Sequence, residues 1–159
     1  MSERYWVLLR HGKAVHQSSS AKDVDRELSR HGQGEAEAAA SWLQAQVNGR
    51  GVRLISSSAA RAAGTARIVA DALGTEVRID DAIYEATPGA LMAILNEAGD
   101  TGITVLVGHN PGIEQSVALL AEGRTDDYRG MPTAAIAWFE VPDGLVEPGS
   151  ARLAAYWSP

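Results

Sequence analysis

A short apolar run near the start of the chain stops abruptly at a cation, an imidazole and a glycine, Arg10-His11-Gly12. The run itself, Tyr5–Leu9, is too short for a core helix and is typical of a buried strand. In an open parallel sheet, ligands collect just beyond the carboxyl ends of the strands. The sequence therefore predicts a strand that delivers two chemically useful side chains to a ligand-binding edge.

Two further apolar runs end in the same manner. Val52–Ile55 leads into a serine-rich turn and a helix start, and Ile103–Val107 leads into a glycine and a second imidazole. If the three strands are parallel neighbours, their carboxyl ends meet at one edge of the sheet. We expect a phosphate pocket there, and its side chains are Arg10, His11, Arg61 and His109.

The rest of the chain alternates expected helices and strands, which indicates a single α/β domain. Four helices are expected: one from the cap Ser29 to Val47, Ala60–Leu73, one from the cap Thr87 through Pro88 to Ala98, and one from the cap Asn110, with Pro111 at the first helical position, to Ala121. Three further strands are expected: Val77–Ile79 and an antiparallel terminal pair, Ala134–Val141 and Arg152–Trp157.

Composition narrows the possible chemistry. The chain has 159 residues, 45% of them hydrophobic, which suffices for the core of one domain. It has no cysteine, which excludes disulfides, cysteine-based zinc sites and a thiolate nucleophile. Its net charge of −6 argues against nonspecific binding to nucleic acid or to anionic membranes. Because no run resembles a membrane span or a signal peptide, we expect a cytoplasmic protein.

The expected edge residues suit phosphate chemistry. A dianionic phosphate needs several fixed cationic donors, and the planar guanidinium groups of Arg10 and Arg61 match its oxygens. Nearby guanidinium charge also holds an imidazole neutral. A neutral imidazole is nucleophilic, so His11 could itself take the phosphoryl group. Taken alone, Arg61 is equally consistent with a solvated residue or a carboxylate partner.

Arg-His-Gly occurs a second time, at Arg30–Gly32, and this copy serves as an internal control. It lies in the first turn of an expected helix and follows no apolar strand. We interpret His31 as an exposed residue with no reason to face the pocket. The position at a strand end, rather than the tripeptide, carries the prediction for His11.

Three motifs and three shorter features combine into a recognisable pattern. The motifs are Arg10-His11-Gly12, Ser57-Ser58-Ala59-x-Arg61 followed by Thr65-Ala66, and Val107-Gly108-His109-Asn110-Pro111-Gly112. The shorter features are Arg26-x-Leu28-Ser29-x-x-Gly32, Pro132–Ala137 and Tyr156–Pro159. Together they resemble the histidine phosphatase superfamily, which also contains the phosphoglycerate mutases, and within it the short bacterial phosphohistidine phosphatases of the SixA type. The resemblance implies a phosphoglycerate mutase-like three-layer sandwich, with a mostly parallel central sheet and an antiparallel C-terminal strand.

The resemblance also implies roles for the edge residues. In that family the first histidine becomes phosphorylated, and the two arginines and the second histidine hold the phosphoryl oxygens. Carried over, His11 is the nucleophile and the clamp consists of Arg10, Arg61 and His109. No cofactor is implied. A zinc site built from His11, His16 and His109 would place a dication beside two arginines, which electrostatics opposes.

The family also places an acid where Glu85 stands, so this residue is expected to protonate the leaving group. Asp80 and Asp81 are alternatives, and Glu85 could instead be only a favourable charge near a helix start. In the first loop, Lys13 and Arg26 could contact substrate or could simply be solvated.

The expected substrate follows from what the chain lacks. Larger members of the superfamily insert a lid before the last site strand, whereas here that interval holds little beyond one strand, a turn and one helix. An open site can admit phosphate displayed on a protein. We therefore expect one domain, residues 1–159, without a lid insertion, that acts on a phosphohistidine-bearing protein and releases inorganic phosphate. The alternatives are a phosphatase of small phosphomonoesters, such as sugar or nucleoside phosphates, and a phosphate-binding module without turnover.

Overall fold

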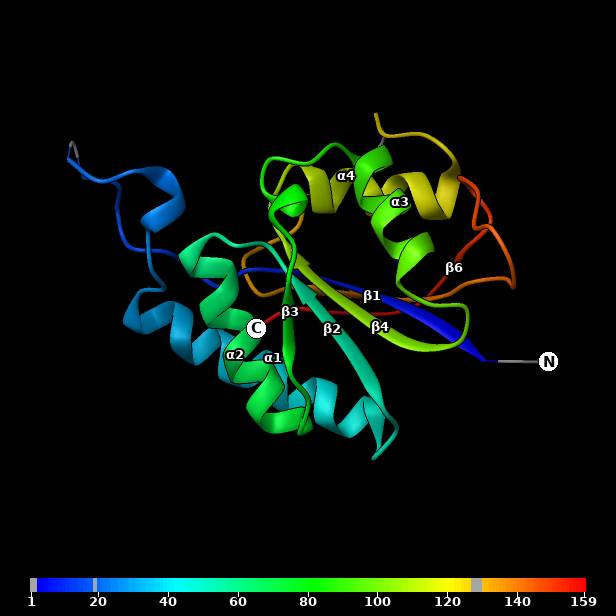
Figure 1. Ribbon diagram of the computed structural model, residues 1–159, viewed down its shortest axis with the longest axis horizontal. Helices are drawn as coiled ribbons and strands as arrows, with labels where there is room; N and C mark the ends of the chain where they lie inside the picture. Colours follow the sequence, from blue (N-terminus) through cyan, green and yellow to red (C-terminus); the bar gives the residue numbers. More distant parts are fainter. Residues whose placement is uncertain (1–2, 19, 127–129) are drawn as a thin grey trace.

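The computed structural model describes residues 3–18, 20–126 and 130–159, and within them strands and helices alternate up to α4, after which two strands follow (Figure 1). The strands are β1 (Arg4–Arg10), β2 (Val52–Ser56), β3 (Val77–Ile79), β4 (Gly102–Gly108), β5 (Ile136–Glu140) and β6 (Arg152–Trp157). The helices are α1 (Arg30–Val47), α2 (Ala60–Leu73), α3 (Pro88–Ala98) and α4 (Gly112–Glu122), with short 3-10 turns η1 (Asp23–Asp25) and η2 (Asp81–Ile83). Every end of the six strands and of α1 to α4 lies within two residues of its expected position, whereas η1 and η2 were not expected.

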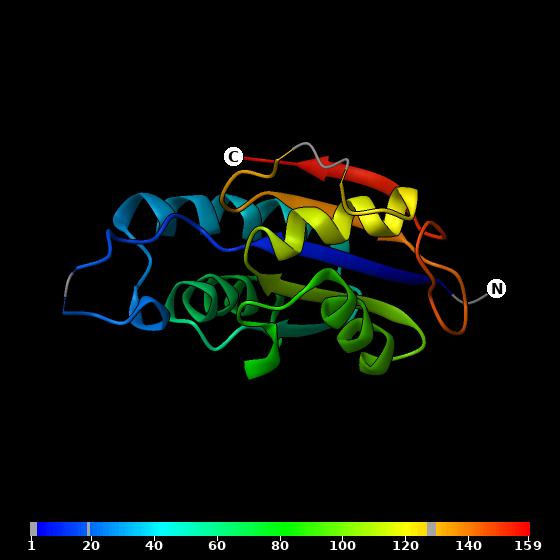
Figure 2. The ribbon, with the colours of Figure 1, turned by 90° about the horizontal axis from the view of Figure 1, so that it is seen from above.

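The strands form one sheet in the order β3-β2-β4-β1-β5-β6, which Figure 2 shows edge to edge. β1, β4, β2 and β3 are parallel, whereas β5 is antiparallel to both of its neighbours. The expected α/β class, with a mostly parallel sheet and antiparallel pairing at the C-terminus, is confirmed. Arg10 pairs with Gly108, and Ser56 pairs with Val107. The three central strands therefore end level with one another.

Helices cover both faces of the sheet, as Figure 1 shows. Val7 and Leu9 belong to a core that packs against α1 and α2, and Trp6 and Leu8 belong to a second core against α3 and α4. Successive side chains of a strand point to opposite faces, so β1 must be apolar at every one of these positions. Within the described residues, no helix is both long enough and apolar enough to span a bilayer.

The expected helix caps are present at two helices. The Ser29 hydroxyl accepts a hydrogen bond from the Gly32 backbone N–H at 3.0 Å, at the start of α1. Thr87 does the same for Ala90 at the start of α3, where Pro88 is the first helical residue. A side-chain oxygen in this position satisfies a backbone donor that the helix cannot pair.

The predicted start of α4 is wrong by one residue. Pro111 is not the first helical residue but the residue before it, and the Asn110–Pro111 peptide bond is cis. Asn110 therefore lies outside the capping position. Its side chain instead bridges two segments: Oδ1 accepts from the Glu114 backbone N–H at 3.2 Å, and Nδ2 donates to the Met131 carbonyl at 2.8 Å.

The second Arg-His-Gly copy packs against the first. A Cβ atom on Gly32 would lie 2.0 Å from the Lys13 carbonyl oxygen, and one on Gly12 would lie 2.6 Å from the Gly32 carbonyl oxygen. Both positions therefore require glycine. His31 itself is exposed, and its Nε2 lies 3.7 Å from a Glu35 carboxylate oxygen. The first copy thus places two side chains at a strand end, whereas the second supplies a glycine that lets the two segments pack closely.

Candidate active site

The structure brings together the four side chains that were expected at the strand ends. Arg10 is the last residue of β1 and His11 follows it, Arg61 lies in the first turn of α2, and His109 follows β4. The ring centroids of His11 and His109 are 5.1 Å apart. His11 and Arg61 are buried, with 8% and 7% of their surfaces exposed. Their chemical roles stay a prediction.

The ring of His11 is held in one tautomer by the next residue. Its Nδ1 lies 2.7 Å from the Gly12 carbonyl oxygen. A carbonyl oxygen only accepts hydrogen bonds, so Nδ1 carries the proton. In the neutral ring, Nε2 is then the nitrogen with a free lone pair. The Gly12 backbone N–H donates to the buried Thr65 hydroxyl at 3.0 Å, which anchors this carbonyl in place.

Both imidazoles are neutral at pH 7. Burial lowers the pKa of His11 from 6.5 to about 3, and the nearby His109, Arg61 and Arg10 lower it as well. Burial, followed by the charge of Arg61, lowers the pKa of His109 to about 4. The sequence predicted that guanidinium charge would keep His11 unprotonated, but loss of solvent is the larger cause.

Ser57 determines which nitrogen of His109 carries the proton. The Ser57 Oγ lies 2.8 Å from His109 Nε2 and also accepts a hydrogen bond from the Ala59 backbone N–H. Ser57 is fully buried, and within the described residues its hydroxyl hydrogen has no acceptor besides Nε2. Because buried hydroxyls are hydrogen-bonded, Nε2 accepts and Nδ1 is protonated. That Nδ1 is buried and has no partner among the described residues.

Arg10 is held by a backbone carbonyl from the segment before β5. Its Nη1 donates to the Met131 carbonyl at 2.8 Å, the same oxygen that accepts from Asn110. Its Nε is buried and forms no hydrogen bond in the part of the chain that the structure describes. Burial lowers the pKa of Arg10 below its ordinary value, yet a guanidinium group stays charged at neutral pH. Arg10 therefore offers a fixed positive charge and a spare donor.

Arg61 is paired with a carboxylate from the first loop. Its Nη1 donates to the Asp23 carbonyl at 2.8 Å, and its Nη2 donates to Asp23 Oδ2 at 2.9 Å. The Tyr84 hydroxyl donates to the same Oδ2 at 2.6 Å. That hydrogen bond, with those from Arg26 and Arg61, holds the pKa of Asp23 well below its ordinary value. The carboxylate partner that the sequence left open for Arg61 is therefore Asp23.

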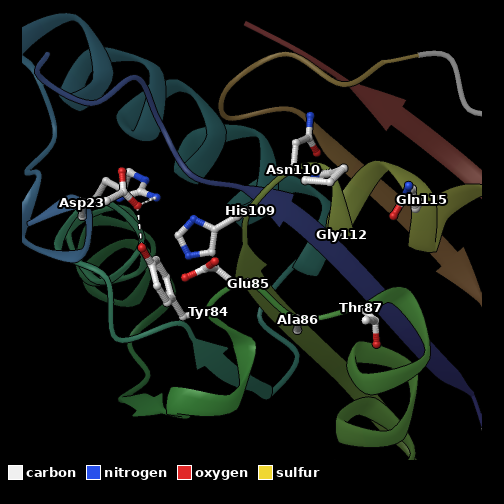
Figure 3. A pocket seen from close by; sticks show the side chains of 11 residues that line it. Asp23, Tyr84, Glu85, Ala86, Thr87, His109, Asn110, Gly112 and Gln115 are labelled. Atoms are coloured by element: carbon white, nitrogen blue, oxygen red, sulfur yellow. Dashed lines mark hydrogen bonds and ion pairs between the residues drawn. The ribbon is translucent and has the colours of Figure 1, made fainter. Parts of the chain in front are cut away.

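A cavity of about 660 Å³ lies beside these groups. Figure 3 shows His109 near its centre, with Tyr84 and Glu85 next to it. The lining residues are Asp23, Arg61, Tyr84, Glu85, Ala86, Thr87, His109, Asn110, Pro111, Gly112 and Gln115. Glu85 is exposed and has a φ of 57°, which is unusual for a residue other than glycine. His11 is not among the lining residues. Its ring packs against the ring of His109, which is one of them.

The alternative acids lie elsewhere. Asp80 accepts a hydrogen bond from the Ala82 backbone N–H at 2.9 Å and so caps η2, and Asp81 is exposed within η2. Neither lines the cavity. Of the three carboxylates considered for proton transfer, Glu85 alone is in the lining.

The other candidate contacts of the first loop are not in the cavity lining either. Lys13 is exposed. Arg26 donates to the Val15 carbonyl and to Asp23, so it ties the loop together. His16 is exposed. Within residues 3–18, 20–126 and 130–159, no three His, Asp or Glu side chains lie close enough together to hold a metal ion.

Sequence reasoning missed Asp23 and Tyr84 and gave Ser57 no role of its own. Asp23 stands in a polar loop with no hydrophobic periodicity, where it is one of several charges. Tyr84 could have been suspected, because it precedes the expected acid Glu85. Its ring meets the His109 ring edge-on, at a centroid distance of 5.4 Å.

Comparison with known proteins assigns this arrangement to a family. The family model of the histidine phosphatase superfamily (branch 1) matches residues 6–101. The chain belongs to this superfamily. An uncharacterized protein of Mycobacterium tuberculosis strain H37Rv is 30% identical over 164 residues, which cover 95% of this chain and 99% of that protein.

Solved structures of this superfamily share the whole fold. A protein from Agrobacterium tumefaciens assigned as the phosphohistidine phosphatase SixA superposes with a TM-score of 0.82 at 26% identity, over 98% of each chain. The mycobacterial glucosyl-3-phosphoglycerate phosphatase superposes with a TM-score of 0.74 at 20% identity, over 98% of this chain and 99% of that one. The protein is thus a phosphatase hydrolase of this superfamily, and it has the expected phosphoglycerate mutase-like fold.

Proposed function

We propose that this histidine phosphatase hydrolyses phosphohistidine on other proteins, through a phosphohistidine intermediate on its own His11. The tautomer of His11 carries the proposal. Its Nδ1 is committed to the Gly12 carbonyl, so the lone pair of Nε2 is free. A phosphate-binding module without turnover would need the cationic clamp but not a buried neutral imidazole held in this way.

Two successive displacements account for the reaction. In the first, the Nε2 lone pair of His11 attacks phosphorus, and the bond between phosphorus and the substrate imidazole breaks as Glu85 protonates the departing nitrogen. In the second, water attacks the phosphorus on His11, Glu85 takes a proton from that water, and the bond from phosphorus to Nε2 breaks. The products are a free histidine on the partner protein, inorganic phosphate and regenerated His11.

The clamp supplies most of the expected rate enhancement. The transferring phosphoryl group spreads charge over its equatorial oxygens, so fixed donors around them lower the barrier. Arg10 Nε and His109 Nδ1 are buried donors with no acceptor among the described residues. An unsatisfied buried donor costs roughly 1–3 kcal/mol, and an oxyanion between these groups would remove that cost. Since the guanidinium groups already provide positive charge, we expect activity without a metal ion.

An open site supports a protein substrate. We propose one domain without a lid insertion, because between α2 and β4 the chain adds only β3, η2 and α3. A phosphate displayed on a protein surface could enter such a site. The likeness to the SixA structure from Agrobacterium tumefaciens supports the same choice. The likeness to a glucosyl-3-phosphoglycerate phosphatase favours a second candidate, a phosphatase of small phosphomonoesters such as sugar phosphates.

Phosphorylation of the enzyme tests the mechanism. Incubation with labelled phosphoramidate should give an acid-labile label on the wild-type protein and none on His11→Ala. The matched control is His31→Ala, the exposed histidine of the second Arg-His-Gly copy, which should label normally. Unchanged turnover by His11→Ala would reject the covalent mechanism. Loss of activity in EDTA, restored by a divalent ion, would reject metal independence.

Substrate preference is tested separately. The values of kcat/KM for a phosphohistidine-bearing carrier domain and for a panel of sugar and nucleoside monophosphates should favour the carrier domain. A strong preference for one of the small esters would establish the second candidate instead. Binding of phosphate with no turnover of any substrate would indicate a binding module.

A further inference from the structure

Asp23 joins three separate segments at the wall of the cavity. It lies in η1 within the first loop, and it contacts Arg61 at the start of α2 and Tyr84 after η2. Figure 3 shows its carboxylate joined by a dashed line to Tyr84. Its side chain is 35% exposed, and Asp23 lines the cavity. The proposed reaction gives this residue no role.

The contacts of Asp23 orient the guanidinium group of Arg61. The backbone carbonyl of Asp23 accepts from Nη1 and its Oδ2 accepts from Nη2, so both terminal nitrogens are held by one residue. Two hydrogen bonds to a rigid fork fix its plane as well as its position. They use two of the five N–H donors of the guanidinium. The donors that remain are enough for a bidentate contact with an oxyanion.

The same carboxylate reaches the second imidazole through an aromatic ring. Asp23 Oδ2 accepts the Tyr84 hydroxyl at 2.6 Å. The Tyr84 ring then meets the His109 ring edge-on, with an interplanar angle of 87°. A packed ring edge limits the rotation of the imidazole beside it. Asp23 therefore acts on two members of the clamp, directly on Arg61 and indirectly on His109.

We propose that Asp23 is a positioning residue that holds Arg61, and through Tyr84 the ring of His109, in the geometry needed for phosphoryl transfer. The proposal rests on the proposed function of the site. The sign of the change in binding on neutralising Asp23 tests the proposal, because a carboxylate beside an anion-binding site repels an anionic substrate. If Asp23 contributed only charge, its neutralisation would strengthen oxyanion binding. If it positions the clamp, its neutralisation weakens both binding and turnover.

Asp23→Asn keeps the size of the side chain and removes its charge. We expect kcat on the phosphohistidine carrier domain to fall about 10- to 100-fold, with a smaller change in KM, because misplacing a clamp group by roughly 1 Å can cost 100-fold. Affinity for tungstate, measured by calorimetry, should also fall. The matched control is Asp25→Asn in the same turn. Asp25 is exposed and makes no side-chain hydrogen bond within the described residues, so both quantities should stay at wild-type values.

A double-mutant cycle separates positioning from general damage to the fold. In an Arg61→Lys background the oriented fork is absent, so Asp23→Asn should cost far less than it does in the wild type. Full additivity of the two losses would overturn the proposal, as would an Asp23→Asn protein that matches Asp25→Asn or that binds tungstate more tightly. A wild-type protein that neither binds tungstate nor turns over phosphohistidine would instead refute the proposed function, and this inference with it.

Discussion

The Oγ of Ser57 lies 2.8 Å from Nε2 of His109, and this contact leaves Nδ1 as the only proton donor of that neutral ring. A neutral histidine has two tautomers, and the proposed role of His109 as a donor to an oxyanion requires the one with the proton on Nδ1. Ser57, the residue after β2, therefore favours this tautomer before any ligand binds.

Ser57→Ala should remove the hydrogen bond that selects this tautomer of His109. We expect kcat to fall about 10- to 100-fold, the range typical when the hydrogen-bond partner that orients a metal-binding histidine is removed. The neighbouring Ser58→Ala is the control, because the Ser58 hydroxyl makes no hydrogen bond among the described residues. ¹⁵N chemical shifts of His109 would report the tautomer directly. Unchanged shifts and unchanged kcat in Ser57→Ala would contradict the assignment.

The buried imidazoles should make the protein sensitive to mild acid. Both have a pKa below the ordinary 6.5 in the folded state, about 3 for His11 and about 4 for His109. Between about pH 6.5 and pH 4, the unfolded chain therefore binds protons that the folded chain does not, and the free energy of unfolding falls as the pH falls. His11→Asn should reduce this slope by up to about 1.4 kcal/mol per pH unit. Urea titrations at several pH values would measure it, and an unaltered slope would count against a buried neutral His11.

Gly32→Ala should destabilise the protein through the backbone next to the proposed nucleophile, His11. Its Cβ would lie 2.0 Å from the Lys13 carbonyl oxygen, so the chain that follows Gly12 must shift. We expect a loss of about 1–3 kcal/mol in the free energy of unfolding, together with lower kcat. Gly34→Ala, in the same helix, meets nothing within 4 Å and should instead add up to about 1 kcal/mol. Equal effects of the two substitutions in urea unfolding would refute the close contact.

Glu85→Gln should reveal the proton donor through the leaving group. With alkyl phosphates, which need protonation as they leave, we expect kcat to fall about 10²- to 10⁴-fold. With p-nitrophenyl phosphate, whose leaving group departs as a stable anion, the first step should be much less affected. Rapid-mixing measurements of the p-nitrophenol burst would isolate this first step, and release of inorganic phosphate would give kcat for the alkyl phosphates. Asp81→Asn, at the exposed alternative acid, should change neither. An equal loss on both kinds of ester would exclude Glu85 as the acid for the leaving group.

The strand-end residues of the site could be predicted from the sequence, because the end of a buried strand leaves a strong signal. A buried strand must be apolar on both faces, so the point at which it turns into Arg10 and His11 is easy to find. Helix starts leave a similarly local signal. Ser29 and Thr87 are residue types that cap a helix from the position just before its first residue. Parallel pairing of neighbouring strands then places separate motifs at one edge.

What the sequence could not predict depends on contacts between distant loops. Asp23 and Arg61 are 38 positions apart, and neither belongs to a periodic pattern that would pair them. The Met131 carbonyl that holds Arg10 is a backbone atom, which no residue type reveals. At the start of α4, proline fits the first helical position on propensity alone, but the chain enters through a cis peptide bond and begins the helix one residue later.

The two cores on opposite faces of the sheet also determine how local unfolding affects the site. Arg61 stands on α2, which belongs to one core, and His109 leads into α4, which belongs to the other. Local unfolding of either helical layer would separate the side chains of the proposed anion clamp. Saturating oxyanion should therefore slow hydrogen exchange throughout both layers together, because only the intact molecule can hold it.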